Sequence, residues 1–412
     1  MRLSSVLALV VFPLALAGAA ATTACGEDSR SLPATGAAGA AGSAAQQGGS
    51  SSGGSDAGGS NGVGGAGNGV ALCPGASAPA NADICPAGAP HAPDCAQTKA
   101  KPVQSCGVLA RVEPDASVDS KRTADTEEYA ATGPIDTTCF EKANWKTVGV
   151  SKTVTLHGFV RNFSNGCDAR NVKVEVFTVK RGGADDGSPD KLIGSEVITG
   201  NGACAEGATD CKLIEVEEKC PNKRIWRAYE YPNVPTETEL LIRTKSPDDA
   251  TDYAPLYDFN VYISNDDPGV AEGRYERPLR AVVISDFSLI PQVAYGSPIT
   301  PGNGAVAGEI HDCGDVRVTN ATFGVSRKGA AESYFTDNEK VPLPDGQATS
   351  TSILGLYSAY DLTPGPVRVV ALARIDGQET SLGYFDVRIF PNAISSMTFR
   401  GFRPFQAAAA GK

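Results

Sequence analysis

Residues 385–390 have the sequence Phe-Asp-Val-Arg-Ile-Phe, in which apolar and charged residues alternate. Successive side chains of a β-strand point to opposite faces, so the Phe, Val and Ile side chains are expected to face a core, and Asp386 and Arg388 to face water. Other short alternating runs lie between clusters of Gly, Pro and Asp, at 153–160, 172–177, 259–263 and 367–372. No long run has a helical period, so the pattern predicts antiparallel sandwich strands and no helix.

The later part of the chain contains an internal repeat. Gly158 is followed 13 residues later by Asn171, and Gly308 is followed 12 residues later by Asn320, with a Cys in between in both cases. Each unit then continues with an aromatic strand, a short turn and an apolar strand. The repeat predicts two related β-sandwiches, which we place at residues 145–298 and 299–406, followed by a disordered tail at 407–412.

The second unit resembles the carboxypeptidase regulatory-like, or transthyretin-like, domains. The residues that match the family pattern are Gly308, Asn320, Ala321, Thr349, Gly355, Tyr357, Leu362 and Gly365, with Ser350 at a position where the family usually has Asp. The first unit keeps Gly158 and the turn at 233–236 and lacks the Gly-x-Tyr. The resemblance implies seven-stranded Greek-key sandwiches, which are common accessory modules of secreted proteins. We therefore expect an all-β fold of two antiparallel Greek-key β-sandwiches.

The N-terminus has the features of a secretory signal peptide, which we assign to residues 1–24. Arg2 precedes an apolar run of 16 residues, shorter than the roughly 20 needed to cross a bilayer. The run ends in Thr-Thr-Ala-Cys, which resembles a bacterial lipobox with Thr22 in place of the usual Leu. We expect lipidation at Cys25. Ordinary signal cleavage, which would release a soluble secreted product, is the alternative.

A low-complexity tract follows the proposed lipidation site. Of the 35 residues from Gly36 to Val70, 28 are Gly, Ala or Ser, so this tract cannot bury a core. A flexible chain of this length has a mean reach of about 30 Å. We interpret residues 25–71 as a lipid-anchored flexible linker.

The cysteines indicate an oxidising compartment. Cys25 aside, the chain has ten, an even number that suits five disulfides. Four, from Cys73 to Cys106, lie in the Pro-rich part of residues 72–144, with a spacing unlike that of zinc ribbons. We therefore expect a small disulfide-stapled segment with a connector at 72–144. Five lie in or next to the first sandwich, an odd number, so we expect Cys313 to pair with one of these five and hold the sandwiches as a rigid pair. The ten are Cys73, Cys85, Cys95, Cys106, Cys139, Cys167, Cys204, Cys211, Cys220 and Cys313.

Composition excludes several function classes. The net charge is −11 and Lys and Arg are not clustered, which argues against nucleic-acid binding. The three His have no metalloenzyme spacing, and His311 lies beside a Cys that we expect to be in a disulfide. Tyr357 and the two Trp are more easily explained as packing residues than as ligand platforms. The acidic loops at 185–186, 248–252 and 265–267 lack a Ca²⁺-loop pattern and are explained as solvated turns, with Ca²⁺ binding as the alternative.

These observations predict a non-catalytic cell-envelope lipoprotein without cofactors. It would be exported, anchored to the outer membrane through its N-terminal lipid, and would present tandem β-sandwich domains to a protein or polysaccharide partner. Because the resembling domains often accompany peptidases, the alternative is an accessory subunit of an extracellular peptidase or other hydrolase assembly.

Overall fold

The computed structural model describes residues 110–114, 129–131, 135–140, 146–163, 167–214, 224–336, 342–375 and 378–406. These residues form twenty-two strands, β1 to β22, and the helix α1 (Ile284–Tyr295). The predicted all-β class is confirmed. The expected signal peptide, Cys25, the linker, the cysteines at 73, 85, 95, 106 and 220, and the tail lie outside the described residues.

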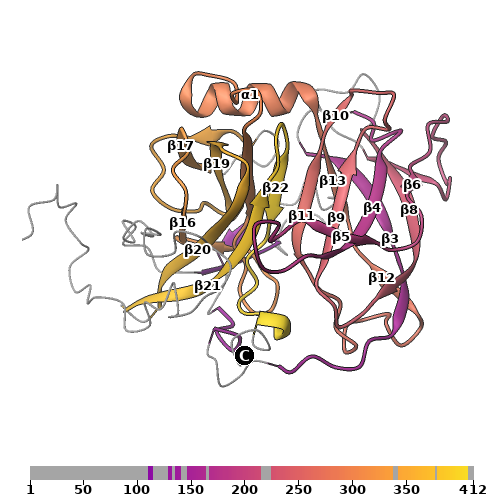
Figure 1. Ribbon diagram of the computed structural model, residues 1–412, viewed down its shortest axis with the longest axis horizontal. Coiled ribbons are helices and arrows are strands. Elements are labelled where there is room, and N and C mark those ends of the chain that lie inside the picture. Colours follow the sequence, from indigo (N-terminus) through magenta and orange to yellow (C-terminus); the bar gives the residue numbers. More distant parts are fainter. Residues whose placement is uncertain are drawn as a thin grey trace, which may run out of the picture. The chain divides into compact units, whose positions relative to one another are not determined.

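The largest sheet contains strands from both predicted sandwiches (Figure 1). The two sets meet where β11 pairs in parallel with β22, with Leu256 opposite Ile394 and Phe259 opposite Met397. In order across the sheet, the strands are β18 (Pro344–Asp345), β17 (Ala331–Phe335), β19 (Leu356–Leu362), β14 (Gly304–Glu309), β22 (Ile394–Met397), β11 (Leu256–Val261), β9 (Leu240–Lys245), β4 (Lys173–Val179) and β5 (Pro189–Leu192), with β6 (Val197–Ile198) also paired to β4. We call this the shared sheet.

Three smaller sheets accompany the shared sheet. The first, which we call the early sheet, contains β10 (Tyr253–Ala254), β13 (Leu279–Val283), β3 (Thr153–Asn162), β8 (Arg224–Pro235) and β7 (Cys211–Ile214), with β12 (Arg274–Glu276) also paired to β3. The second, the late sheet, contains β16 (Thr322–Val325), β20 (Gly365–Ile375) and β21 (Gln378–Ile389). The third contains β15 (Val318–Thr319), β1 (Ala110–Pro114) and β2 (Tyr129–Ala131).

The shared sheet has a core on each face, because apolar residues on its central strands point alternately to opposite sides. On β9, Leu240 and Ile242 pack with residues of the early sheet, such as Leu156 and Tyr229. The intervening Leu241 belongs to the other core, which includes β20 and β21. The early and late sheets therefore cover opposite faces of the shared sheet.

The predicted division into two sandwiches at residue 298 is not confirmed. The described residues all belong to one compact unit, and Phe177, Leu241 and Phe259 of the first predicted sandwich share a core with Phe323 and Phe385 of the second. The Greek-key topology is likewise not confirmed. The structure instead has two halves that contribute strands to one common sheet.

The internal repeat is nevertheless visible as a shared packing motif. In the first half, Gly158 lies opposite Tyr229, whose hydroxyl donates to the Arg277 carbonyl oxygen at 2.7 Å. In the second half, Gly308 lies opposite Tyr357, whose hydroxyl donates to the Met397 carbonyl oxygen at 2.6 Å. A Cβ atom on either glycine would lie within 2.4 Å of that same carbonyl oxygen. Each Gly therefore lets a neighbouring backbone approach closely, and each Tyr hydrogen-bonds to it.

A second motif repeats in the same two halves. The Thr199 hydroxyl accepts from the Val172 amide and donates to the Ala169 carbonyl, and the Thr351 hydroxyl does the same with Ala321 and Val318. The residues that precede the two amides, Asn171 and Asn320, both have a positive φ, of 54° and 60°. Asn tolerates this left-handed conformation better than most residues. The prediction that Asn171 and Asn320 occupy equivalent positions in the repeat is confirmed.

One burial prediction is wrong. Phe385, Val387 and Ile389 are buried as expected, but Asp386 is 8% exposed. It accepts two hydrogen bonds, both of 2.7 Å, from the buried guanidinium of Arg368 on the neighbouring strand. Strand alternation predicted the direction of the Asp386 side chain and gave no information about this partner.

Helix α1 was not predicted either. It has Pro291 inside it and no side-chain N-cap, and it ends at Gly296, whose φ is 84°. Phe287 and Ile290 pack against Ile299 and Tyr360 at one end of the shared sheet. The helix is thus held by tertiary packing more than by local helix signals.

Two disulfides are described with both partners, Cys204–Cys211 and Cys139–Cys313, and Cys167 is also disulfide-bonded. The expectation that Cys313 pairs with one of the five earlier cysteines is confirmed. Cys139 precedes β3, so this bridge ties the connector, rather than a strand of the first half, to the second half. The two halves themselves are held together by the shared sheet.

We predict that Gly308→Ala destabilises the protein by about 2 kcal/mol or more, because its Cβ would meet the Met397 carbonyl oxygen at 1.8 Å and β22 would have to shift. Urea unfolding measures the effect. Gly346→Ala is the matched control, since a Cβ there meets nothing within 4 Å and the φ of Gly346 is not positive. Equal stability of the two variants would contradict this account of the repeat.

Candidate functional site

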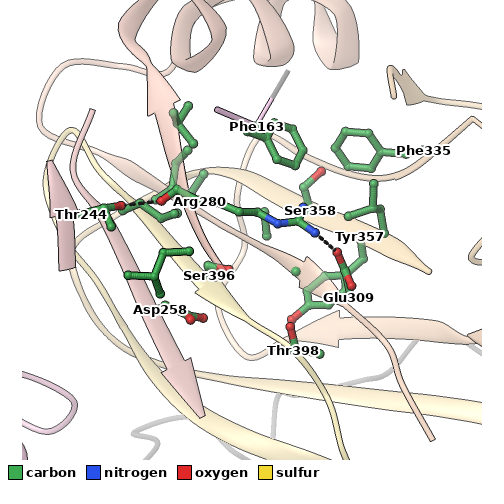
Figure 2. A pocket seen from close by; sticks show the side chains of 18 of the residues that line it. Phe163, Thr244, Asp258, Arg280, Glu309, Phe335, Tyr357, Ser358, Ser396 and Thr398 are labelled. Atoms are coloured by element: carbon green, nitrogen blue, oxygen red, sulfur yellow. Dashed lines mark hydrogen bonds and ion pairs between the residues drawn. The ribbon is translucent and has the colours of Figure 1, made fainter. Parts of the chain in front are cut away.

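A cavity of about 460 Å³ lies between the shared sheet, the edge of the early sheet and helix α1. It forms because the early sheet covers the shared sheet only over its β4, β9 and β11 part. Beyond that edge, α1 closes the space at the end of the shared sheet where Phe287 and Ile290 pack against Ile299 and Tyr360. Figure 2 shows the side chains that line this space.

The floor of the cavity is formed by small residues on adjacent strands. Ser358, Ala307, Ser396 and Asp258 lie in register across β19, β14, β22 and β11. All four side chains line the cavity. Because small residues follow one another across four strands, the sheet leaves room above them.

The end of the cavity beneath the helix is mainly apolar, although buried Asp286 of α1 also lines it. Ile290 of α1 belongs to two small hydrophobic clusters, one with Ile299 and Tyr360 and the other with Phe335 and Phe163. In Figure 2, Phe163 and Phe335 lie nearer the helix, and Asp258 and Thr398 lie farther from it.

The opposite end is charged, and its central group is Glu309. This carboxylate accepts from Arg280 at 2.5 Å and from Arg317 at 3.3 Å, and it lies 2.8 Å from Nε2 of His311. The other ring nitrogen of His311 lies 2.7 Å from Asp315, which also binds Arg400. We call these six residues the Glu309 network.

The Glu309 network moves the pKa values of its members. Burial opposes ionisation of Glu309, but the charges of Arg317 and Arg280 and the contact with His311 outweigh it and hold its pKa well below the usual value. The pKa of Asp315 is also lowered, because its contacts with His311 and Arg400 outweigh burial. Burial lowers the pKa of His311, but hydrogen bonds to Asp315 and Glu309 outweigh this and raise it. The network therefore favours two carboxylates around a protonated imidazole.

Arg277 is a further cationic group in the cavity wall. Its guanidinium donates to Asp258 at 2.6 Å. The residue is 9% exposed, and its Nε is buried without a hydrogen-bond partner among the described residues. A buried donor of this kind costs free energy unless something accepts from it.

Taken together, arginines outnumber carboxylates in the cavity lining. Arg161, Arg277, Arg280, Arg317 and Arg400 line it, as do Asp258, Asp286, Glu309 and Asp315. The excess is one positive charge with His311 neutral and two with it protonated. This excess contrasts with the net charge of −11 of the whole chain.

The residues that the sequence analysis considered as ligand or catalytic groups lie in different parts of the structure. Tyr357 is fully buried and holds the Met397 carbonyl, so it packs in the core as predicted. Trp226 is 8% exposed and lies outside the cavity lining, and Trp145 is outside the described residues. Cys313 is in a disulfide, as predicted, while His311 joins the Glu309 network.

The acidic loops have partners within the protein. The expectation of a solvated turn is wrong for Asp186, which is buried and accepts from the Gly182 amide. Asp248 binds Lys173 and Lys245, and Asp267 accepts from the Ser264 amide. Among the described residues, no group of three His, Cys, Asp or Glu is placed to hold a metal ion. No helix in the described ranges is long and apolar enough to span a membrane.

The sequence did not reveal the cavity. Its arginines come from β3, the β12–β13 segment, the residues before β15 and the stretch after β22, and no local motif links them. Comparison with known proteins adds nothing here: no family model matches the chain, and no curated protein is similar to it.

We predict that His311→Gln changes the pH dependence of stability. Because the pKa of His311 is raised on folding, its contribution is fully present below about pH 6.5 and is lost as pH rises through the folded pKa. Each unit by which the folded pKa exceeds the unfolded pKa is worth about 1.4 kcal/mol. Between pH 6 and 9, the wild type should therefore lose more unfolding free energy than the variant.

Urea unfolding across this pH range measures the difference. His157→Gln removes a histidine that does not line the cavity and should leave the pH dependence of the wild type in place. Parallel curves for the wild type and His311→Gln would show that the imidazole is not ionised by the network.

Proposed function

We propose that this protein is a non-catalytic, exported lipoprotein of the cell envelope that binds a small ligand in the cavity beneath α1. The observation that carries the proposal is the cavity itself. Its size and its mainly apolar lining with a few convergent polar groups are typical of small-molecule sites. A protein or polysaccharide partner of the envelope would deliver or receive the ligand.

The charges of the cavity favour binding over catalysis. A general acid or base works best when its pKa is close to the operating pH. The pKa values of Glu309 and Asp315 are instead moved away from neutrality, and His311 is held between the two carboxylates. The two carboxylates are therefore suited to a fixed electrostatic environment.

The disulfides support export, because such bonds persist in oxidising compartments. The repeated Gly–Tyr and Asn–Thr motifs support the proposal that each half derives from a Greek-key sandwich of the carboxypeptidase regulatory-like type. In this proposal, residues 1–24 are removed, Cys25 bears the lipid at the outer membrane, and residues 25–71 tether the folded part.

Lipid attachment is tested by intact mass. We expect the mature protein to begin at Cys25 with added acyl mass, and Cys25→Ser to release the protein from membranes. A mature species that begins at Cys25 without acyl mass, or one cleaved elsewhere, would contradict the anchor.

Ligand binding is tested with the neutral apolar dye N-phenyl-1-naphthylamine. Its fluorescence should rise on binding to the full-length protein, and Ala307→Phe should weaken binding about tenfold or more, equivalent to about 1.4 kcal/mol, because the ring fills the floor of the cavity. Ser396→Leu fills the neighbouring position and is a second test.

Ala271→Phe is the matched control, since Ala271 is exposed and lies outside the cavity lining. It should bind the dye as the wild type does. Two results would refute a binding function for this cavity. One is absence of dye binding to the wild type, and the other is wild-type dye affinity in folded Ala307→Phe and Ser396→Leu variants.

A further inference from the structure

We propose that the ligand of this cavity is an amphipathic monocarboxylate, with its apolar body under α1 and its carboxylate at the arginine end. This inference rests on the proposed binding function and adds the chemical class of the ligand. It comes from the two-ended arrangement of the lining and from the charges at one end.

Apart from Asp286 of α1, the lining is apolar near the helix and charged at the opposite end. In the shared sheet, the row with Ala305, Ile394 and Leu256 is apolar, and the next row contains Ala307, Ser396 and Asp258. Glu309, two residues beyond Ala307 on β14, begins the charged end. A ligand with uniform polarity would leave one of the two ends poorly matched, whereas an amphipathic ligand matches both.

The charges at that end favour an anion. Arg280, Arg317, Arg400 and His311 lie around two carboxylates, Glu309 and Asp315. The neighbouring Arg277 also lines the cavity, and its guanidinium donates to Asp258. A planar guanidinium is well suited to a carboxylate, to which it can donate two parallel hydrogen bonds. An ammonium group would instead meet an excess of like charge.

The charge of the cavity limits the charge of the ligand's head group, and its volume limits the size of the ligand's apolar body. An excess of one or two positive charges in the lining matches a singly charged carboxylate. At about 30 Å³ for each water, the cavity volume corresponds to about fifteen waters. Octanoate has ten non-hydrogen atoms and serves as a probe of suitable size.

The experiment is displacement of N-phenyl-1-naphthylamine from the full-length protein at pH 7 by four compounds. They are octanoate, 1-octanol, octylammonium and acetate. Octanoate should compete at a concentration about tenfold lower than octanol, a difference of about 1.4 kcal/mol. Octylammonium should compete more weakly than octanol, and acetate should not compete, because it lacks the apolar body.

Two variants test the arginine end. Arg277→Met should weaken octanoate about tenfold and leave octanol unchanged, because only the charged head uses the guanidinium. Arg280→Met should act in the same direction. Because the Arg280 side chain is more exposed than that of Arg277, this variant keeps the test valid if Arg277→Met does not fold. Arg274→Met is the matched control, since Arg274 lies on β12, pairs with exposed Glu230 and does not line the cavity.

The outcomes separate the two proposals. If the dye binds and the three octyl compounds compete equally, or octylammonium competes best, the ligand class is wrong and the binding function stands. Competition by acetate equal to that by octanoate would indicate a simple anion site and would also overturn the inference. If the dye does not bind at all, the proposed function itself fails.

Discussion

The parallel pairing of β11 with β22 joins strands from the two predicted sandwiches into one sheet. Each of these strands would otherwise present an open edge with unpaired backbone N–H and C=O groups. Four residue pairs, from Leu256–Ile394 to Phe259–Met397, close that edge. Because the strands on either side belong to different halves, the position of this pairing also sets how far the early sheet reaches over the shared sheet. The cavity and the placement of α1 follow from that offset.

The two halves show how a repeated unit acquires different surroundings. In both, a tyrosine hydroxyl binds a carbonyl oxygen that approaches a glycine, so the local structure around Gly158 and Gly308 is alike. The segments that supply the two carbonyl oxygens have different neighbours. In the first half Arg277, just after β12, turns its side chain toward Asp258 of the shared sheet, whereas in the second half Met397 is enclosed in the core. The same backbone contact thus brings an arginine into the cavity wall on one side only.

The sequence predicted the features that depend on local pattern. Alternation located β3, β4, β11, β20 and β21, because the period of a strand is visible within a few residues. Counting cysteines predicted a partner for Cys313 among five candidates, but parity carries no information about distance and could not select Cys139. The β11–β22 pairing and the contacts of Arg280 and Arg400 with the Glu309 network join residues far apart in the chain. Arg368 lies opposite Asp386 across a single hairpin, but alternation does not determine that register. Helix α1 was missed because Pro291 and the uncapped start at Val283 give no helix signal.

The disulfide between Cys139 and Cys313 spans 174 positions, a stretch that includes every strand from β3 to β13, helix α1 and β14. Residues 200–203, in the loop between β6 and β7, are exposed, and exposed loops of this kind are the sites that proteases attack first. A cut there would divide the chain into two fragments that remain covalently linked through the bridge, while the shared sheet continues to hold β4 beside β9. A single proteolytic cut at this loop would therefore leave both fragments attached, with the residues that surround the cavity still in place.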